Sequence, residues 1–200
     1  MLLHVGTHRT GTTSIQRFLR DHPAKLAEVG LIFPRGQFLA DNHVELHMLA
    51  MRPERETFAR RMFPQPSPVT PRPDALWSAE GLSLLRYPDE IERVVDMIGV
   101  PDRVIMFIRE PASFLASYTR NLAKVGVSPS SDPDSTAYVE PDSWLIDYDA
   151  RIGLWREIVG ADRVTVLDYD GDVIPKFADL LGIDALPELT RYRLNQGVST

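Results

Sequence analysis

The chain has 200 residues, 44% of them hydrophobic and 25% charged, which is ordinary for one globular domain with a sizeable core. Its formal net charge of -6 argues against a protein that coats nucleic acid or lies on a membrane surface. The absence of cysteine excludes disulfides, a thiol nucleophile and thiolate zinc sites. The start of the chain is too short for the apolar core of a signal peptide, and no stretch approaches the ~18 apolar residues of a membrane span. We therefore expect a cytoplasmic enzyme with a single domain over residues 1–200.

Hydrophobic runs alternate with helical patterns along the chain. Strands are expected at 2–5, 31–33, 76–78, 104–108 and 163–168, and helices at 12–29, 44–51, 54–62, 81–85, 88–98, 112–125, 147–159 and 173–181. The prolines between residues 64 and 73 predict a surface loop. The segment 126–141, rich in Ser, Pro and Asp, predicts a second loop or a lid. Strands that alternate with helices indicate an α/β fold with a doubly wound parallel sheet flanked by helices.

The most informative segment is the turn between the first expected strand and the first expected helix. Gly6 and Gly11 have the spacing of a Walker A loop, in which backbone N–H groups and a helix N-terminus surround a phosphate. Thr12 stands where a nucleotide triphosphatase carries its lysine. Arg9 is the only Arg or Lys inside the loop, so its cation approaches a bound anion from a different side.

A second phosphate-binding pattern follows the strand at 104–108. Arg109 ends this strand, Pro111 suits the first turn of a helix, and Ser117 lies about two turns into that helix. A planar guanidinium can hold a phosphate with two hydrogen bonds, and the serine adds a hydroxyl from the same helix. The pattern therefore predicts a second anion site.

In this order, the two motifs resemble those of sulfotransferases that use 3′-phosphoadenosine 5′-phosphosulfate (PAPS), in particular short soluble bacterial members of the carbohydrate type. The resemblance implies a P-loop NTPase-like sheet, 3′,5′-adenosine bisphosphate (PAP) as product, no metal, and an acceptor hydroxyl or amine on a carbohydrate or small molecule. It implies that the donor is held by Arg9, Thr10, Gly11, Thr12, Thr13, Ser14, Arg109 and Ser117. It also implies that Arg9, where the family usually has lysine, stabilises charge on the bridging oxygen.

The base that would take the acceptor's proton stays open. His47 or His43 would suit this task, because a histidine titrates near neutral pH. Glu80 and Glu45 are the carboxylate alternatives, and the family often has a serine and a glutamate where this chain has Ser78 and Glu80. The spacing of His43 and His47 also allows a zinc site, but Glu45 is one place late for the metalloprotease pattern and no third ligand is evident. We therefore expect no metal.

Two other functions remain open at this point. The run Val164–Asp168 could be a Walker B strand whose aspartate holds magnesium, which would make the chain a P-loop kinase. The missing lysine at position 12 argues against that interpretation. A nucleotide-binding module without activity would need the loop but no base. The C-terminal segment 191–199 resembles a late stretch of the sulfotransferase family that helps to shape the donor pocket.

Overall fold

The computed structural model describes residues 1–38, 41–55, 57–62, 65–183 and 192. Its strands are β1 (Leu2–His4), β2 (Leu76–Ser78), β3 (Arg103–Ile108) and β4 (Val164–Asp168). Its α-helices are α1 (Thr12–Asp21), α2 (Pro23–Glu28), α3 (Val44–Ala50), α4 (Phe58–Met62), α5 (Pro88–Ile98), α6 (Pro111–Lys124), α7 (Tyr148–Val159) and α8 (Val173–Leu181). Short 3₁₀ helices are η2 (Glu80–Leu84), η3 (Trp144–Ile146) and η4 (Ala161–Arg163).

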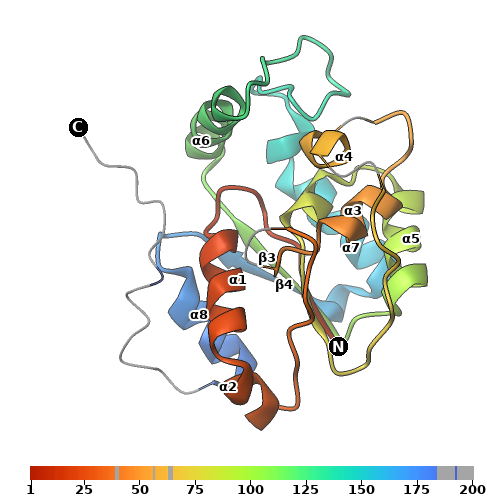
Figure 1. Ribbon diagram of the computed structural model, residues 1–200. Coiled ribbons are helices and arrows are strands. Elements are labelled where there is room, and N and C mark those ends of the chain that lie inside the picture. The colour runs from red at the N-terminus through yellow and green to blue at the C-terminus, as the bar shows by residue number, and fades with distance from the viewer. Residues whose placement is uncertain (39–40, 56, 63–64, 184–191, 193–200) are drawn as a thin grey trace.

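The strands form one parallel sheet in the order β2-β1-β3-β4 (Figure 1). Leu3 of β1 lies opposite Trp77 of β2 and Val104 of β3, and Val104 lies opposite Val164 of β4. The chain passes from β1 to β2 on one side and then crosses back to β3 on the other side. Such a reversal marks the point where α/β proteins bind ligands, beyond the carboxyl ends of the strands.

Helices cover both faces of the sheet. On one face, Phe18 of α1 and Phe177 of α8 belong to the same buried cluster as Phe107 of β3. On the other face, Met106 of β3 lies in a second cluster with Trp155 of α7 and with residues of α3 and α5. Adjacent residues of a strand point to opposite faces, so each strand contributes to both clusters. Figure 1 shows α1, α2 and α8 on one side of the sheet and α3, α5 and α7 on the other, which confirms the predicted α/β fold.

The first helix ends earlier than its sequence pattern predicts. α1 stops at Asp21 and α2 begins at Pro23, so the expected helix at 12–29 is two helices. Proline lacks the N–H of a helix interior and disfavours helical backbone at the residue before it. His22 accordingly has φ -124° and ψ 51°.

Three weaker predictions differ from the structure. The expected strand at 31–33 is reduced to a single bridge between Ile32 and Ala75. The expected helix at 54–62 keeps only the short α4, and the expected α-helix at 81–85 is the 3₁₀ helix η2. Residues 65–73 and 126–141 contain no helix or strand, as their prolines and small polar residues predict.

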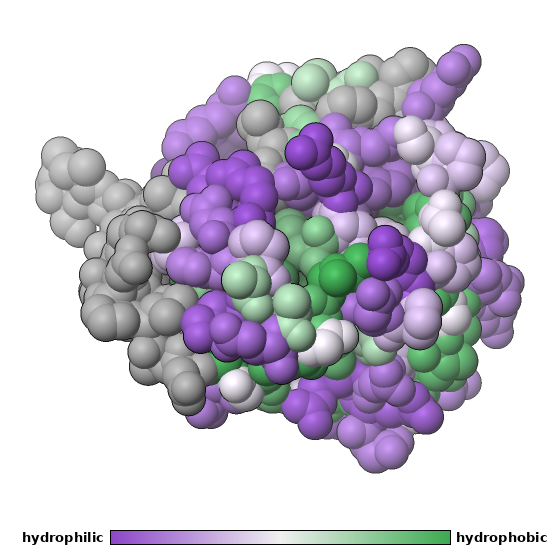
Figure 2. Space-filling view, turned by 60° about the horizontal axis from the view of Figure 1, so that its bottom comes forward, coloured by the Kyte–Doolittle hydropathy of each residue, from purple (hydrophilic) through white to green (hydrophobic). Residues whose placement is uncertain are grey.

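The surface is mixed rather than apolar. Figure 2 shows hydrophilic residues around a smaller group of hydrophobic ones on one face of the molecule. Among the described residues, the exposed large hydrophobic side chains are Leu49, Met62 and Val100. No helix within the described ranges is long and apolar enough to cross a lipid bilayer.

Candidate functional site

The two predicted phosphate motifs meet at the carboxyl ends of β1 and β3. The chain leaves β1 through Val5, whose N–H donates to the Ile105 carbonyl at 3.0 Å, so the strand pairing continues past His4. Thr7 then donates to the Phe107 carbonyl at 3.0 Å. The loop between β1 and α1 is therefore held against β3, next to the position where Arg109 follows that strand.

The loop at residues 6–14 has the backbone of an anion cradle. Gly11 has φ 79°, a left-handed conformation that glycine adopts without steric cost, and a side chain there would meet Val173 at 2.7 Å. Arg9 also has a positive φ, of 63°. The hydroxyls of Thr10 and Thr12 donate to the Thr7 carbonyl at 2.6 and 3.2 Å, which fixes the loop internally. The Ser14 N–H donates to the Gly11 carbonyl at 2.9 Å, whereas the N–H groups of Thr12 and Thr13 have no partner within the helix, so they can receive an anion.

Arg9 and Arg109 come together although they are far apart in sequence. Arg9 donates from Nε to the Ser117 hydroxyl at 3.1 Å, and Arg109 donates from Nη1 to the Arg9 carbonyl at 3.1 Å. Arg109 also donates from Nε to the Ser113 hydroxyl at 2.9 Å. Neither guanidinium forms a salt bridge within the described residues. Two unpaired cations beside a helix N-terminus fit a ligand that carries more than one negative group.

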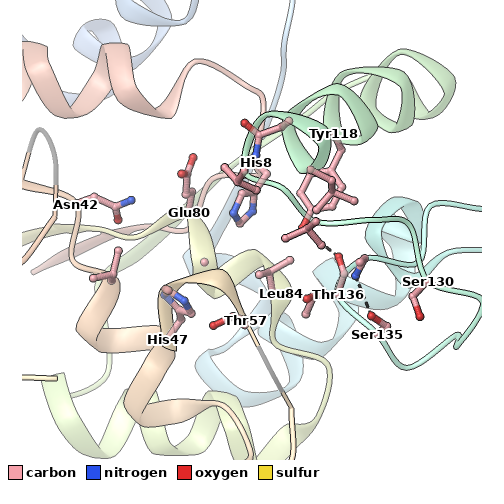
Figure 3. A pocket seen from close by; sticks show the side chains of 18 of the residues that line it. His8, Asn42, His47, Thr57, Glu80, Leu84, Tyr118, Ser130, Ser135 and Thr136 are labelled. Atoms are coloured by element: carbon pink, nitrogen blue, oxygen red, sulfur yellow. Dashed lines mark hydrogen bonds between the residues drawn. The ribbon is translucent and has the colours of Figure 1, made fainter. Parts of the chain in front are cut away.

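A cavity of about 430 Å³ opens beside this cluster. Its wall combines His8, Glu80 and His47 with aliphatic side chains and with several hydroxyl and amide groups. Figure 3 shows Glu80, His8 and Tyr118 along one side and Ser130, Ser135 and Thr136 from the segment 126–141 at the far end. The Tyr118 hydroxyl donates to the Thr136 carbonyl at 3.1 Å, which ties this segment to α6. The predicted loop at 126–141 therefore forms one wall of the cavity.

Glu80 lies between the cavity and the phosphate loop. It is the first residue of η2, directly beyond the carboxyl end of β2. Burial raises the pKa of its carboxyl group, while the neighbouring Thr12 side chain and the charge of Arg9 act in the opposite direction. A carboxyl group with a raised pKa in a cleft is suited to proton transfer.

His47 lines the cavity from α3. Its ring is buried, its Nδ1 has no hydrogen-bond partner within the described residues, and burial lowers its pKa to about 3. A Cβ at Gly81 would overlap this ring, so only glycine at that position lets His47 pack there. His47 is therefore a neutral histidine that lines the cavity, with its Nδ1, unpartnered among the described residues, buried beside Gly81.

His43 and Glu45 lie elsewhere. The Ser78 N–H donates to His43 Nδ1 at 3.0 Å, and His43 Nε2 lies 3.0 Å from the Pro34 carbonyl, so both ring nitrogens are used within the fold. Glu45 Oε2 accepts from the Gln37 N–H at 3.4 Å, and burial raises its pKa. Neither residue lines the cavity. The geometry of the cavity therefore favours Glu80 and His47 over His43 and Glu45 as groups that could reach an acceptor.

Sequence reasoning missed His8. It lies inside the phosphate loop, two residues after Gly6, but its side chain faces the cavity, with its ring between Glu80 and Tyr118 (Figure 3). Its Nδ1 is 3.0 Å from the Ser83 hydroxyl. Burial and the charges of Arg151 and Arg9 lower its pKa to about 3. Its position inside the loop could have indicated a role for His8, but the pattern of glycines and threonines around it was interpreted only as a binding site for an anion.

The zinc and magnesium alternatives gain no support. Within the described residues no group of three or more His, Cys, Asp or Glu side chains could hold a metal ion. Asp168 is exposed at the end of β4, which β3 separates from β1 and its loop. The C-terminal stretch at 191–199 lies outside the described residues except for Tyr192, whose hydroxyl donates to Asp21 at 3.1 Å.

A crystal structure of a sulfotransferase from Alicyclobacillus acidocaldarius has the same fold, with a TM-score of 0.59 and 18% sequence identity. The match covers 95% of this chain and 87% of that protein. No protein-family model matches the sequence, and no curated protein matches it either. At this identity the likeness establishes the fold alone.

Proposed function

We propose that this chain is a sulfotransferase that moves a sulfuryl group from PAPS to an acceptor hydroxyl or amine. The observation that carries the proposal is the cluster of Arg9, Ser117 and Arg109 beside the loop at the start of α1. Within the described residues neither guanidinium forms a salt bridge, which fits a ligand with separate anionic groups, and PAPS has a 5′-phosphosulfate and a 3′-phosphate. The fold shared with a solved sulfotransferase supports the same conclusion.

Each part of the cluster would hold one part of the donor. The N–H groups from Thr10 to Ser14 would receive the 5′-phosphate, and Arg109 with Ser117 would hold the 3′-phosphate. Binding energy from the 3′-phosphate would orient a reacting centre that Arg109 does not touch. PAPS supplies an activated sulfuryl group on a phosphate leaving group. Arg9 would stabilise negative charge as it grows on the bridging oxygen, which is the task of a preorganised cation.

The acceptor would occupy the cavity of about 430 Å³. Hydroxyl and amide groups of Thr57, Asn121 and Ser130 alternate there with aliphatic side chains. Such a wall suits a sugar or another small hydroxyl compound, which offers both apolar faces and hydrogen-bonding groups. Glu80 and His47 are the predicted bases that line this cavity, and His43 stays a prediction that its hydrogen bonds disfavour.

The test compares two ligands by thermal unfolding. PAP without magnesium should stabilise the protein by about 2.7 kcal/mol at 100 times its dissociation constant. ATP with magnesium should stabilise it much less, because ATP has no 3′-phosphate for Arg109. Stabilisation by ATP with magnesium but not by PAP would favour the kinase. Binding of PAP without turnover of PAPS would favour a nucleotide-binding module without activity.

A further inference from the structure

His8 takes part in a short chain of hydrogen bonds that fixes where its proton lies. The Ser83 hydroxyl lies 2.7 Å from the Glu80 carbonyl and 3.0 Å from His8 Nδ1. A carbonyl can only accept, so the single hydroxyl proton of Ser83 points to Glu80. His8 Nδ1 must then carry a proton and donate to the Ser83 oxygen. In the neutral ring this leaves Nε2 without a proton.

The side chain of His8 belongs to the cavity wall. His8 lines the cavity, and its ring and the Tyr118 ring form a T-shaped contact with the centroids 5.7 Å apart. Glu80 lies next to it, and the backbone of Glu80 closes the hydrogen-bond chain. An acceptor in the cavity can therefore reach an imidazole whose basic nitrogen is already selected.

Burial, and after it the positive charges nearby, lower the pKa of His8 and keep it neutral in the free protein. The charges of Arg151 on α7 and of Arg9 in the loop both lower the pKa of His8. The charge of His8 in turn lowers the pKa of the nearby His47. Glu80 and Tyr118 are the other titratable groups at this wall. An anion bound beside Arg9 offsets one of the two positive charges. The basicity of His8 should therefore increase when the phosphate loop is filled.

We propose that His8 is the general base of the reaction and that Ser83 is its positioning residue. The inference rests on the proposed sulfuryl transfer. The acceptor hydroxyl gives its proton to His8 Nε2, and its oxygen uses the released electron pair to form the bond to sulfur. The bond between sulfur and the bridging oxygen breaks, and its electron pair stays on the 5′-phosphate. The proton on His8 returns to solvent when the products leave. Glu80 then shapes the site through its carbonyl and its charge rather than as the base.

The proton position can be measured without turnover. The ¹⁵N chemical shifts of His8, assigned with His8→Asn, should show the Nδ1–H tautomer in the wild type and a mixture of tautomers in Ser83→Ala. Ser83→Thr, which keeps the hydroxyl, should restore the wild-type pattern. PAP should raise the pKa of His8 by about one unit or more, because it offsets the charge of Arg9. An Nε2–H tautomer in the wild type, or a His8 pKa that bound PAP does not change, would overturn the proposal.

Turnover of PAPS with water as the acceptor tests the catalytic role. His8→Asn should lower the rate of PAP release by about 10²–10⁴ while PAP affinity changes by less than about threefold. Ser83→Ala should move the acidic limb of the pH–rate profile, and Ser83→Thr should restore it. His22→Asn, remote from the cavity, serves as the control and should behave as wild type.

A His8→Asn variant that keeps its turnover excludes His8 as the base, and Glu80→Gln without turnover would then assign that role to Glu80. Failure of PAP to bind the wild type would instead reject the sulfotransferase function, and the tautomer experiment would still decide the role of Ser83.

Discussion

Arg109 donates a hydrogen bond from Nη1 to the backbone carbonyl of Arg9 at 3.1 Å, and this contact joins the two phosphate motifs. The carbonyl belongs to a residue with positive φ, so Arg109 supports a backbone conformation that residues other than glycine rarely adopt. Arg9 in turn contacts Ser117 on the helix that follows Arg109. The loop after β1 is therefore joined to Arg109 and to the helix α6 by hydrogen bonds on both sides of Arg9.

Replacement of Arg109 should separate the two phosphate sites. Arg109→Ala removes a charge-assisted contact, which should cost roughly 1.5–3 kcal/mol of PAP binding. Adenosine 5′-phosphosulfate lacks the 3′-phosphate, so its binding should fall far less. Calorimetry with both ligands measures the difference.

Ser113→Ala is the matched control for this prediction. It removes the hydroxyl that accepts from Arg109 Nε but leaves the guanidinium in place. We expect a smaller loss of PAP affinity than for Arg109→Ala. Equal losses of both ligands in Arg109→Ala would mean that Arg109 acts through the loop backbone and does not bind the 3′-phosphate.

Arg9 should matter more for turnover than for binding. Charge on the bridging oxygen grows toward the transition state, so loss of the cation raises the barrier more than it weakens the ground state. Arg9→Gln should lower kcat by about 10²–10³ and PAP affinity much less. Arg9→Lys keeps the charge and should retain more activity. Equal loss of kcat in both variants would show that the guanidinium geometry is required, and unchanged kcat in Arg9→Gln would exclude the catalytic role.

Local patterns sufficed for much of the fold and for the expectation that the two arginine motifs lie at one edge of the sheet. The apolar run of β3 and the helical spacing of apolar residues in α1 are each formed by residues close together in sequence. A short window of sequence was therefore enough to predict that one is a strand and the other a helix. The glycines around Arg9 and the position of Arg109 after a strand place both at the same edge of a parallel sheet, where they indeed meet. The prediction of a strand at 31–33 was wrong, because this segment pairs with the residues before β2 through a single bridge.

The wall of the cavity depends on contacts that no local pattern contains. His43 and His47 have the spacing of neighbours on one helix face, yet His43 is held by Ser78 and Pro34 while His47 reaches the cavity. His8 gains its role from Ser83, far away in sequence. Such assignments require the tertiary structure because a histidine's function depends on which nitrogen its partners leave free.

Gly81 should be intolerant of any side chain. A Cβ at this position would overlap the buried ring of His47, and the interior has little room to relax. Gly81→Ala should destabilise the fold by about 1–3 kcal/mol or displace His47 from the cavity wall. Gly153 of α7 is the control, since a Cβ there meets nothing within 4 Å. Gly153→Ala should raise the free energy of unfolding by about 0.5–1 kcal/mol. Urea unfolding of the two variants should therefore give changes of opposite sign.

Glu90 should be the carboxylate on which stability depends most. It is fully buried and accepts from Arg55 Nη1 at 2.8 Å and from the Arg52 and Arg86 N–H groups at 2.9 and 2.7 Å. Glu90→Ala leaves these donors and the Arg55 charge without their acceptor, which should cost about 3–5 kcal/mol. Asp89→Ala, its neighbour with a partly exposed side chain, should cost at most about 1 kcal/mol. Similar losses in the two variants would contradict this assignment.

Mild acid should destabilise the fold through its buried histidines. Burial lowers the pKa of His4 to about 3 and that of His43 to about 4, both below the ordinary value of 6.5. Between these lowered pKa values and 6.5, the unfolded chain binds more protons than the folded one. The contribution of the histidines to stability is therefore fully present above pH 6.5 and is lost as the pH falls toward 4. Each histidine can contribute up to about 1.4 kcal/mol for every pH unit in this window.

The raised pKa of Glu45 has the opposite effect on stability. The folded state keeps the carboxyl proton to a higher pH than the unfolded state does. Stability therefore falls as the pH rises above the ordinary pKa of a carboxyl group. Burial also raises the pKa of Glu80, so Glu45 and Glu80 together can offset at most two protons between pH 5 and 6.5, where the unfolded carboxyls are already ionised. The four buried histidines should therefore dominate in this window: His4, His8, His43 and His47. Urea unfolding at pH 7, 6 and 5 measures the slope. His43→Asn lowers stability at every pH because it removes the contacts with Ser78 and Pro34, yet it should flatten the slope by about one proton. A slope that is unchanged in this variant would mean that His43 already carries its proton in the folded state.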